Sequence, residues 1–303
     1  MRVKILGSAA GGGFPQWNCN CRNCAGVRSG HIRARPRSQS SIAVSSDGER
    51  WALCNASPDI LTQIRATQEL QPRQTLRGTG IAAVVLTDGQ IDHVTGLLLL
   101  REGARLPLYA TELVQDDLTH GFPVLRLLDH FCGTDWHPVS IDGVPFSIDG
   151  VDGVEFEALP LASKPAPFSP RRGAPQPGDN IGLVIRDSQS RHSLFYAPGM
   201  AEIDHRMHLE MAGADCLLVD GTFWTDDEMI RLGVGTKRAR EIGHLPQAGV
   251  GGMIERLREF PNARRILIHI NNTNPILDED SEERRALERE GIEVAFDGME
   301  IAL

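Results

Sequence analysis

Short apolar runs recur along the 303-residue chain, and polar or turn-forming residues follow each of them. Continuous runs rich in valine, isoleucine and leucine are typical of strands that are buried on both faces. The pattern predicts one strand in each of the ranges 3–6, 81–87, 106–110, 181–187, 193–198, 215–223 and 263–275, and two strands within 41–56.

Apolar residues at helical spacing separate many of these runs. SPDILTQIRATQEL (57–70) predicts a helix with Ser57 as its N-cap. Alternating apolar and polar residues around Asp-Gly pairs predict a meander of hairpins over 139–161 and a C-terminal hairpin over 292–303. Further helices are predicted at 112–120, 201–212, about 247–259 and 279–291, and a long proline-rich loop is predicted at 164–180.

Two strand-rich halves, each ending in helices, favour an α/β protein with an αββα sandwich, in which helices flank two mixed sheets. We find no repeat and no linker, so residues 1–303 are predicted to form a single domain.

Composition narrows the class of partner. A net charge of −9 and a pI of about 5.6 argue against nucleic-acid binding, which favours a basic surface. The longest apolar runs, at 81–86 and 96–100, are too short to span a bilayer, and the N-terminus lacks the apolar region of a signal peptide. We therefore expect a cytoplasmic protein that binds neither nucleic acid nor membrane.

TDGQIDH (87–93) follows one of the buried runs and resembles the metallo-β-lactamase superfamily sequence T-H-x-H-x-D-H. In that superfamily, three histidines and one aspartate collect two metal ions. Here Asp88 and Gln90 stand at the first two histidine positions, whereas Asp92 and His93 keep theirs. The resemblance implies the sandwich fold and a site at the end of a strand.

At later positions where the superfamily carries metal ligands, this chain has again lost some of the ligating residues. EALPLASK places Ser163 where another histidine belongs, YAPGM has no bridging aspartate, and ILIHINN supplies His269 at the last position. Asp92, His93 and His269 remain, and two imidazoles with one carboxylate suit a single non-haem Fe²⁺. The alternative is that these three residues are remnants in a degenerate pocket.

Five further polar residues are candidates for proton transfer or substrate binding. Asp220 ends the strand CLLVD, and His244 matches the position of a catalytic histidine in phosphodiesterase members of the superfamily. A purely structural hydrogen-bonding role is the alternative for Asp88, Gln90, Asp220 and His244. The set is Asp88, Gln90, Ser163, Asp220 and His244.

NCNCRNC (18–24) brings Cys19, Cys21 and Cys24 onto one turn, as a tetrahedral structural zinc site requires. The fourth ligand stays open. Phosphodiesterase relatives carry a histidine three residues beyond the last catalytic histidine, whereas this chain has Asn272. His269 could serve this zinc instead of the iron, and a reduced thiol cluster is the alternative to any metal.

Four segments together identify a more specific resemblance: GSAAGGGFPQWNCNCRNC, LTDGQIDH, VDGTFW and LIHINNTNP. They resemble the coenzyme PQQ synthesis protein B family over essentially the whole chain. That family acts in making pyrroloquinoline quinone from a glutamate and a tyrosine of a small precursor peptide. The resemblance implies iron- and oxygen-dependent hydroxylation of the tyrosine ring in a Glu-Tyr-derived small molecule.

Two other functions remain open. The chain could carry the quinone or its precursor toward the periplasm, or it could be a metal-dependent hydrolase of esters or phosphates. Other proteins of the same pathway are potential partners, and a homodimer is left open.

Overall fold

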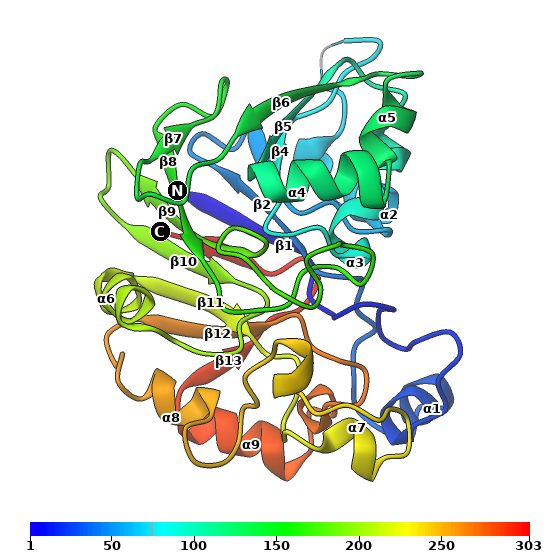
Figure 1. Cartoon of the computed structure of the whole chain (residues 1–303). Coiled ribbons are helices and arrows are strands. Elements are labelled where there is room, and N and C mark those ends of the chain that lie inside the picture. The colour runs from blue at the N-terminus through cyan, green and yellow to red at the C-terminus, as the bar shows by residue number, and fades with distance from the viewer. Residues whose placement is uncertain (74) are drawn as a thin grey trace.

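The computed structural model describes residues 1–73 and 75–303, and these form two seven-stranded sheets packed face to face (Figure 1). The first sheet mixes antiparallel and parallel pairs, with β1 and β2 antiparallel and β3 to β6 parallel. In spatial order its strands are β14 (Glu300–Ala302), β1 (Arg2–Gly7), β2 (Ser41–Ser45), β3 (Trp51–Cys54), β4 (Ile81–Val85), β5 (Leu106–Ala110) and β6 (Thr134–Pro138).

The second sheet is also mixed: its strands run parallel from β10 to β13 and antiparallel from β7 to β10. In spatial order its strands are β13 (Ile292–Val294), β12 (Arg264–Ile268), β11 (Cys216–Asp220), β10 (Ser193–Ala197), β9 (Ile181–Asp187), β8 (Val154–Pro160) and β7 (Phe146–Ser147).

Helices cover the outer faces of both sheets. Figure 1 shows α2, α4 and α5 on the side of the first sheet, and α8 and α9 beside the second. The α-helices are α1 (Arg22–Ser29), α2 (Ile60–Ala66), α3 (Ile91–Val94), α4 (Glu112–Asp116), α5 (Val124–Leu128), α6 (His205–Gly213), α7 (Glu228–Arg231), α8 (Met253–Leu257) and α9 (Glu282–Arg289). Shorter helical turns are η1 (Gln68–Leu70), η2 (Thr95–Leu100), η3 (Asp117–Gly121), η4 (Arg240–Ile242) and η5 (Pro275–Leu277).

The central core lies between the two sheets, where side chains from both inner faces interdigitate. Ile5 and Val85 of the first sheet belong to the same buried cluster as Phe156, Leu218 and Ile266 of the second. Two further apolar clusters lie on the outer faces, one between each sheet and the helices that cover it. The predicted αββα sandwich is confirmed.

The predicted C-terminal hairpin is wrong. β13 pairs with β12 in the second sheet, whereas β14 pairs with β1 in the first, so the chain crosses between the sheets at Asp297 and Gly298. Asp-Gly favours a tight turn locally, but each strand instead protects the edge of a different sheet.

Three smaller predictions also need correction. The meander predicted over 139–161 contains a single hairpin, β7–β8, and the strand β6, whose sequence TDWHP is largely polar, was not predicted. The helix predicted from Ser57 begins at Ile60, because the Ser57 hydroxyl accepts from the Asp59 amide instead of capping the helix. The helix predicted near 247–259 covers only Met253–Leu257.

Gly7, the last residue of β1, packs closely against the neighbouring backbone. A Cβ on Gly7 would lie 2.0 Å from the Gln39 carbonyl oxygen. Among residues 1–73 and 75–303, no helix has the length and apolar character needed to cross a bilayer.

Candidate metal centre and its pocket

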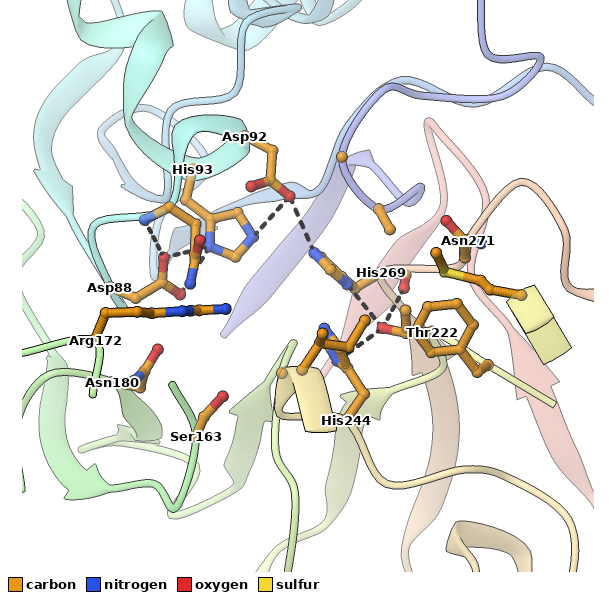
Figure 2. Close-up of a pocket in the computed structure, with 17 residues that line it drawn as sticks. Asp88, Asp92, His93, Ser163, Arg172, Asn180, Thr222, His244, His269 and Asn271 are labelled. Carbon is orange, nitrogen blue, oxygen red and sulfur yellow. Dashed lines mark hydrogen bonds and ion pairs between the residues drawn. The ribbon is translucent and has the colours of Figure 1, made fainter. Parts of the chain in front are cut away.

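The predicted site residues meet where several strands end. TDGQIDH follows β4, Asp220 ends β11, and His269 follows β12. A cavity of about 270 Å³ opens at this edge, between loops of the two sheets. Its lining includes Asp88, Gln90, Asp92, His93, Ser163, Arg172, Asn180, Thr222, His244, His269 and Asn271 (Figure 2).

Asp92, His93 and His269 converge inside this cavity. Nε2 of His269 lies 3.2 Å from Oδ2 of Asp92, and Nε2 of His93 lies 3.9 Å from the same oxygen. The three donor atoms all lie within 4.8 Å of one another. Nε2 of His93 is buried and has no hydrogen-bond partner in the described part of the chain. A buried unpartnered nitrogen beside two other ligand atoms fits a bound divalent cation.

Asp88 orients His93. Both carboxylate oxygens accept from Nδ1 of the ring, at 2.9 and 2.8 Å, so Nε2 is left to face Asp92 and His269. The carboxylate also accepts from the Gln90 amide at 2.8 Å, which fixes its own position. Such a carboxylate–histidine pair is the usual support for a metal-binding imidazole.

The charges of this group are coupled. Burial alone lowers the pKa of His93, but the Asp88 and Asp92 carboxylates outweigh burial and raise it to about 9. Burial alone raises the pKa of Asp92, but His93 and His269 outweigh burial and lower it. The acids are therefore ionised at neutral pH, and a cation that binds here competes with a proton on His93.

Thr222 orients His269 from the other side. Its hydroxyl lies 2.6 Å from Oδ1 of Asp220, to which it donates, and 2.9 Å from Nδ1 of His269, from which it can accept. Nε2 of His269 consequently faces Asp92. The backbone of His269 has a φ of 61°, in the left-handed region that residues other than glycine seldom adopt.

Asp220 is fully buried and reaches the cavity through His244. Nδ1 of His244 donates to Oδ2 of Asp220 at 2.8 Å. Burial alone lowers the pKa of His244, but Asp220 outweighs burial and raises it. Asp220, His244 and His269 also form a second three-donor group that shares His269 with the first.

Gln90 and Ser163 line the cavity as predicted, but each also supports a loop. Nε2 of Gln90 donates to the Lys164 carbonyl oxygen at 3.1 Å, and Oγ of Ser163 donates to the Gly243 carbonyl oxygen at 3.3 Å. Their positions allow contact with a bound molecule, and these hydrogen bonds link the loops around the rim.

Cys19, Cys21 and Cys24 form a separate cluster near the start of α1, with their sulfur atoms within 4.8 Å of one another. Asn272 caps it: Nδ2 lies 3.1, 3.6 and 3.4 Å from the three sulfurs in that order. Burial raises the pKa of Cys21 to about 11, so its thiolate needs a cation beside it. The three sulfurs suit a zinc ion, and Asn272 could supply a fourth ligand only through its amide oxygen, because an amide NH₂ donates to thiolates and does not bind zinc.

The sequence left open whether His269 belongs to the pocket or to the cysteine cluster, and the structure places it in the pocket. His269 faces Asp92 and His93, and Asn272 faces the cysteines. The loops that carry the two clusters are joined, because the Ala10 amide donates to the Ile270 carbonyl oxygen at 2.9 Å.

Sequence reasoning missed Thr222, Arg172 and Asn180. Thr222 lies in VDGTFW directly after β11, where polar residues at a strand end signal a site. Arg172 and Asn180 lie in the proline-rich segment 164–180, whose only signal is that long irregular loops are often functional.

Comparison with known proteins agrees with this geometry. A model of the β-lactamase superfamily domain matches residues 50–270. Coenzyme PQQ synthesis protein B of Pseudomonas paraeruginosa is 58% identical, and that of Methylococcus capsulatus is 55% identical, each over 100% of both chains.

Solved structures give the same result. The zinc-bound PqqB from Methylobacterium extorquens is 42% identical, with a TM-score of 0.90 over 100% of both chains. A diphosphatase of the PhnP family has a TM-score of 0.67 at 21% identity, a likeness of fold alone. The chain therefore belongs to the coenzyme PQQ synthesis protein B family of the metallo-β-lactamase superfamily.

Proposed function

We propose that this protein acts in the synthesis of pyrroloquinoline quinone. Its reaction is the iron- and oxygen-dependent hydroxylation of the tyrosine ring in a small molecule derived from a Glu-Tyr peptide. Relatives that are 58% identical over their full length carry the name coenzyme PQQ synthesis protein B, which supports the pathway.

The observation that carries the proposed chemistry is the Asp92, His93 and His269 group. Two imidazole nitrogens and one carboxylate converge on one side of the cavity, and Nε2 of His93 is buried without a partner in the described chain. This donor set leaves coordination positions open, as oxygen chemistry at non-haem Fe²⁺ requires. When bound, the iron would supply activation of dioxygen.

The chain's own residues would then position the phenol and move its proton. Asp220 holds Nδ1 of His244, which makes the other ring nitrogen a stronger base toward a phenolic proton. Asp88 keeps the ring of His93 in place. Overall, one dioxygen converts the phenol to an ortho-quinone and one water, so the substrate itself supplies the electrons.

Cys19, Cys21 and Cys24 are assigned a structural zinc in this proposal. The three sulfur atoms lie within 4.8 Å of one another, and the related PqqB from Methylobacterium extorquens is zinc-bound in its crystal structure. The ion would fix the N-terminal loop beside the strand end that carries His269.

The test is anaerobic iron loading of the wild type and of His93→Ala, followed by addition of oxygen and a cross-linked Glu-Tyr adduct. We expect oxygen uptake and a hydroxylated or quinone product from the wild type only. Oxygen uptake that is unchanged in His93→Ala would refute the assignment of the iron site.

The second three-donor group supports one competing function. Asp220, His244 and His269 could hold a second ion beside the first, as a dinuclear hydrolase requires. Turnover of generic phosphodiesters by the metal-loaded wild type, without oxygen uptake, would favour that function. Tight binding of the finished coenzyme with neither activity would favour a carrier.

A further inference from the structure

Two adjacent arginines in the loop 164–180 differ in their contacts: the side chain of Arg171 is paired with other residues of the fold, and that of Arg172 lines the cavity. Arg171 is committed to the fold: its Nε lies 2.7 Å from Oδ1 of Asp179, and its Nη1 lies 3.2 Å from Oδ2 of Asp116. Its Nη2 also donates to the Leu113 carbonyl oxygen at 2.7 Å. These contacts fasten the loop to α4, so the neighbouring residue Arg172 is held in a defined position.

Arg172 extends into the cavity instead. Its Nη1 donates to the Pro165 carbonyl oxygen, which holds the side chain against its own loop. Among residues 1–73 and 75–303 it has no ion-pair partner, and its Nε and Nη2 make no hydrogen bond. Figure 2 shows the guanidinium group within the pocket, on the same side as Asp88 and Asn180.

Asn180, at the other end of the same loop, is a second donor without a partner. Its backbone is fixed by a bridge to Asp88 and by donation from the Leu161 amide to its carbonyl oxygen at 2.9 Å. Asn180 is 5% exposed and lines the cavity, yet its buried Nδ2 has no hydrogen-bond partner in the described chain. Buried amide groups are normally paired, and a flip of the amide about its last bond would turn Nδ2 toward a ligand in the cavity.

We propose that Arg172 and Asn180 form a carboxylate-binding subsite that anchors the amino-acid carboxylate of the substrate inside the metal pocket. A guanidinium group presents parallel N–H donors that match a carboxylate, and an amide N–H can complete the contact. Among the described residues that line the cavity, the other ionisable ones are aspartates and histidines, so Arg172 is the one permanent positive charge of this group. The identity of the ligand as amino-acid-derived rests on the function proposed above.

Binding in the absence of oxygen tests the subsite separately from catalysis. Calorimetry would compare the Glu-Tyr adduct with its carboxamide analogue on the full-length, metal-loaded protein under anaerobic conditions. We expect the wild type to prefer the carboxylate form roughly 10- to 100-fold, the range for hydrogen bonds to a charged group. In Arg172→Gln that preference should disappear, while affinity for the carboxamide stays the same.

Further variants distinguish a specific contact with the carboxylate from a general effect of lost charge or lost stability. Arg172→Lys keeps the charge but not the paired donors and should retain part of the preference. Asn180→Ala should lower carboxylate affinity by a smaller factor, about 5-fold. Arg126→Gln removes the same charge from an exposed position on α5 and should behave as the wild type. The melting temperature of each variant shows whether it has folded.

Several outcomes would overturn the proposal. These are equal wild-type affinity for the two ligands, no measurable binding of the adduct, an unchanged preference in a folded Arg172→Gln, or inorganic phosphate binding more tightly than the carboxylate. Under turnover, Arg172→Gln should raise KM and leave kcat nearly unchanged. A preference for the carboxylate without oxygen uptake would refute the proposed hydroxylase activity but support the subsite. Turnover together with an unchanged preference in Arg172→Gln would support the hydroxylase activity but refute the subsite.

Discussion

Glu228 is a buried acid whose protonation should control the stability of the protein. Only 2% of its surface is exposed, at the start of α7, and its carboxyl accepts from the Trp224 amide and the Thr273 hydroxyl. Burial raises its pKa from 4.5 to about 7, although those hydrogen bonds oppose the shift. Thr273 in turn accepts from Asn271, which lines the pocket.

The sign of the effect follows from where the proton is held. Between the unfolded pKa of 4.5 and the folded pKa of about 7, the folded protein binds the proton more tightly than the unfolded chain does. The stabilisation is therefore complete below about pH 4.5 and is lost as the pH rises through about 7. The shift from 4.5 to about 7 corresponds to about 3 kcal/mol of unfolding free energy.

Urea unfolding of the wild type and of Glu228→Gln from about pH 5 to about pH 8 measures this contribution. The glutamine cannot ionise, so the variant should be more stable relative to the wild type at the alkaline end, by about 3 kcal/mol. Glu202→Gln, at an exposed position, should show no such difference. A difference between Glu228→Gln and the wild type that does not change with pH would refute the reasoning.

Two substitutions test the metal clusters. Thr222→Val removes the hydroxyl that lies between Asp220 and His269, so affinity for a metal ion in the pocket should fall about 10-fold, whereas Thr225→Val should have little effect. Competition with a chromogenic chelator measures both, and equal affinity in the two variants would show that Thr222 does not orient His269. Asn272→His should complete a Cys₃His set and raise the zinc affinity of the cysteine cluster about 10-fold or more. Competition with the same chelator measures this affinity, and zinc binding no tighter than in the wild type would show that the histidine does not reach the ion.

The sequence predicts the sandwich and most of the pocket because both depend on local patterns. Apolar runs of strand length mark the buried strands, and the residues that follow them, such as Asp92 and His269, must meet at one edge. The sequence alone could not predict that His269 lies in the pocket and Asn272 beside the cysteines. It depends on how the loop after β12 turns relative to two distant segments.

Non-local pairing explains what sequence reasoning missed. Asp297 and Gly298 fit a hairpin turn, yet β14 pairs with β1 at the opposite end of the chain. Arg172 has no periodic neighbours, and its position depends on the ion pairs of Arg171 with Asp116 and Asp179. Neither arrangement can be recognised from a window of adjacent residues.

If both clusters bind metal as proposed above, the short loop after β12 links the two sites. His269 and Asn272 stand on that loop, one turned to the pocket and the other to the thiols, with Ile270 hydrogen-bonded to the N-terminal loop between them. An ion at either cluster restricts the same backbone, so each filled cluster should pre-order the other, and this thermodynamic linkage is reciprocal. The order in which the two ions are added during reconstitution would then alter the rate of loading but not the final occupancy.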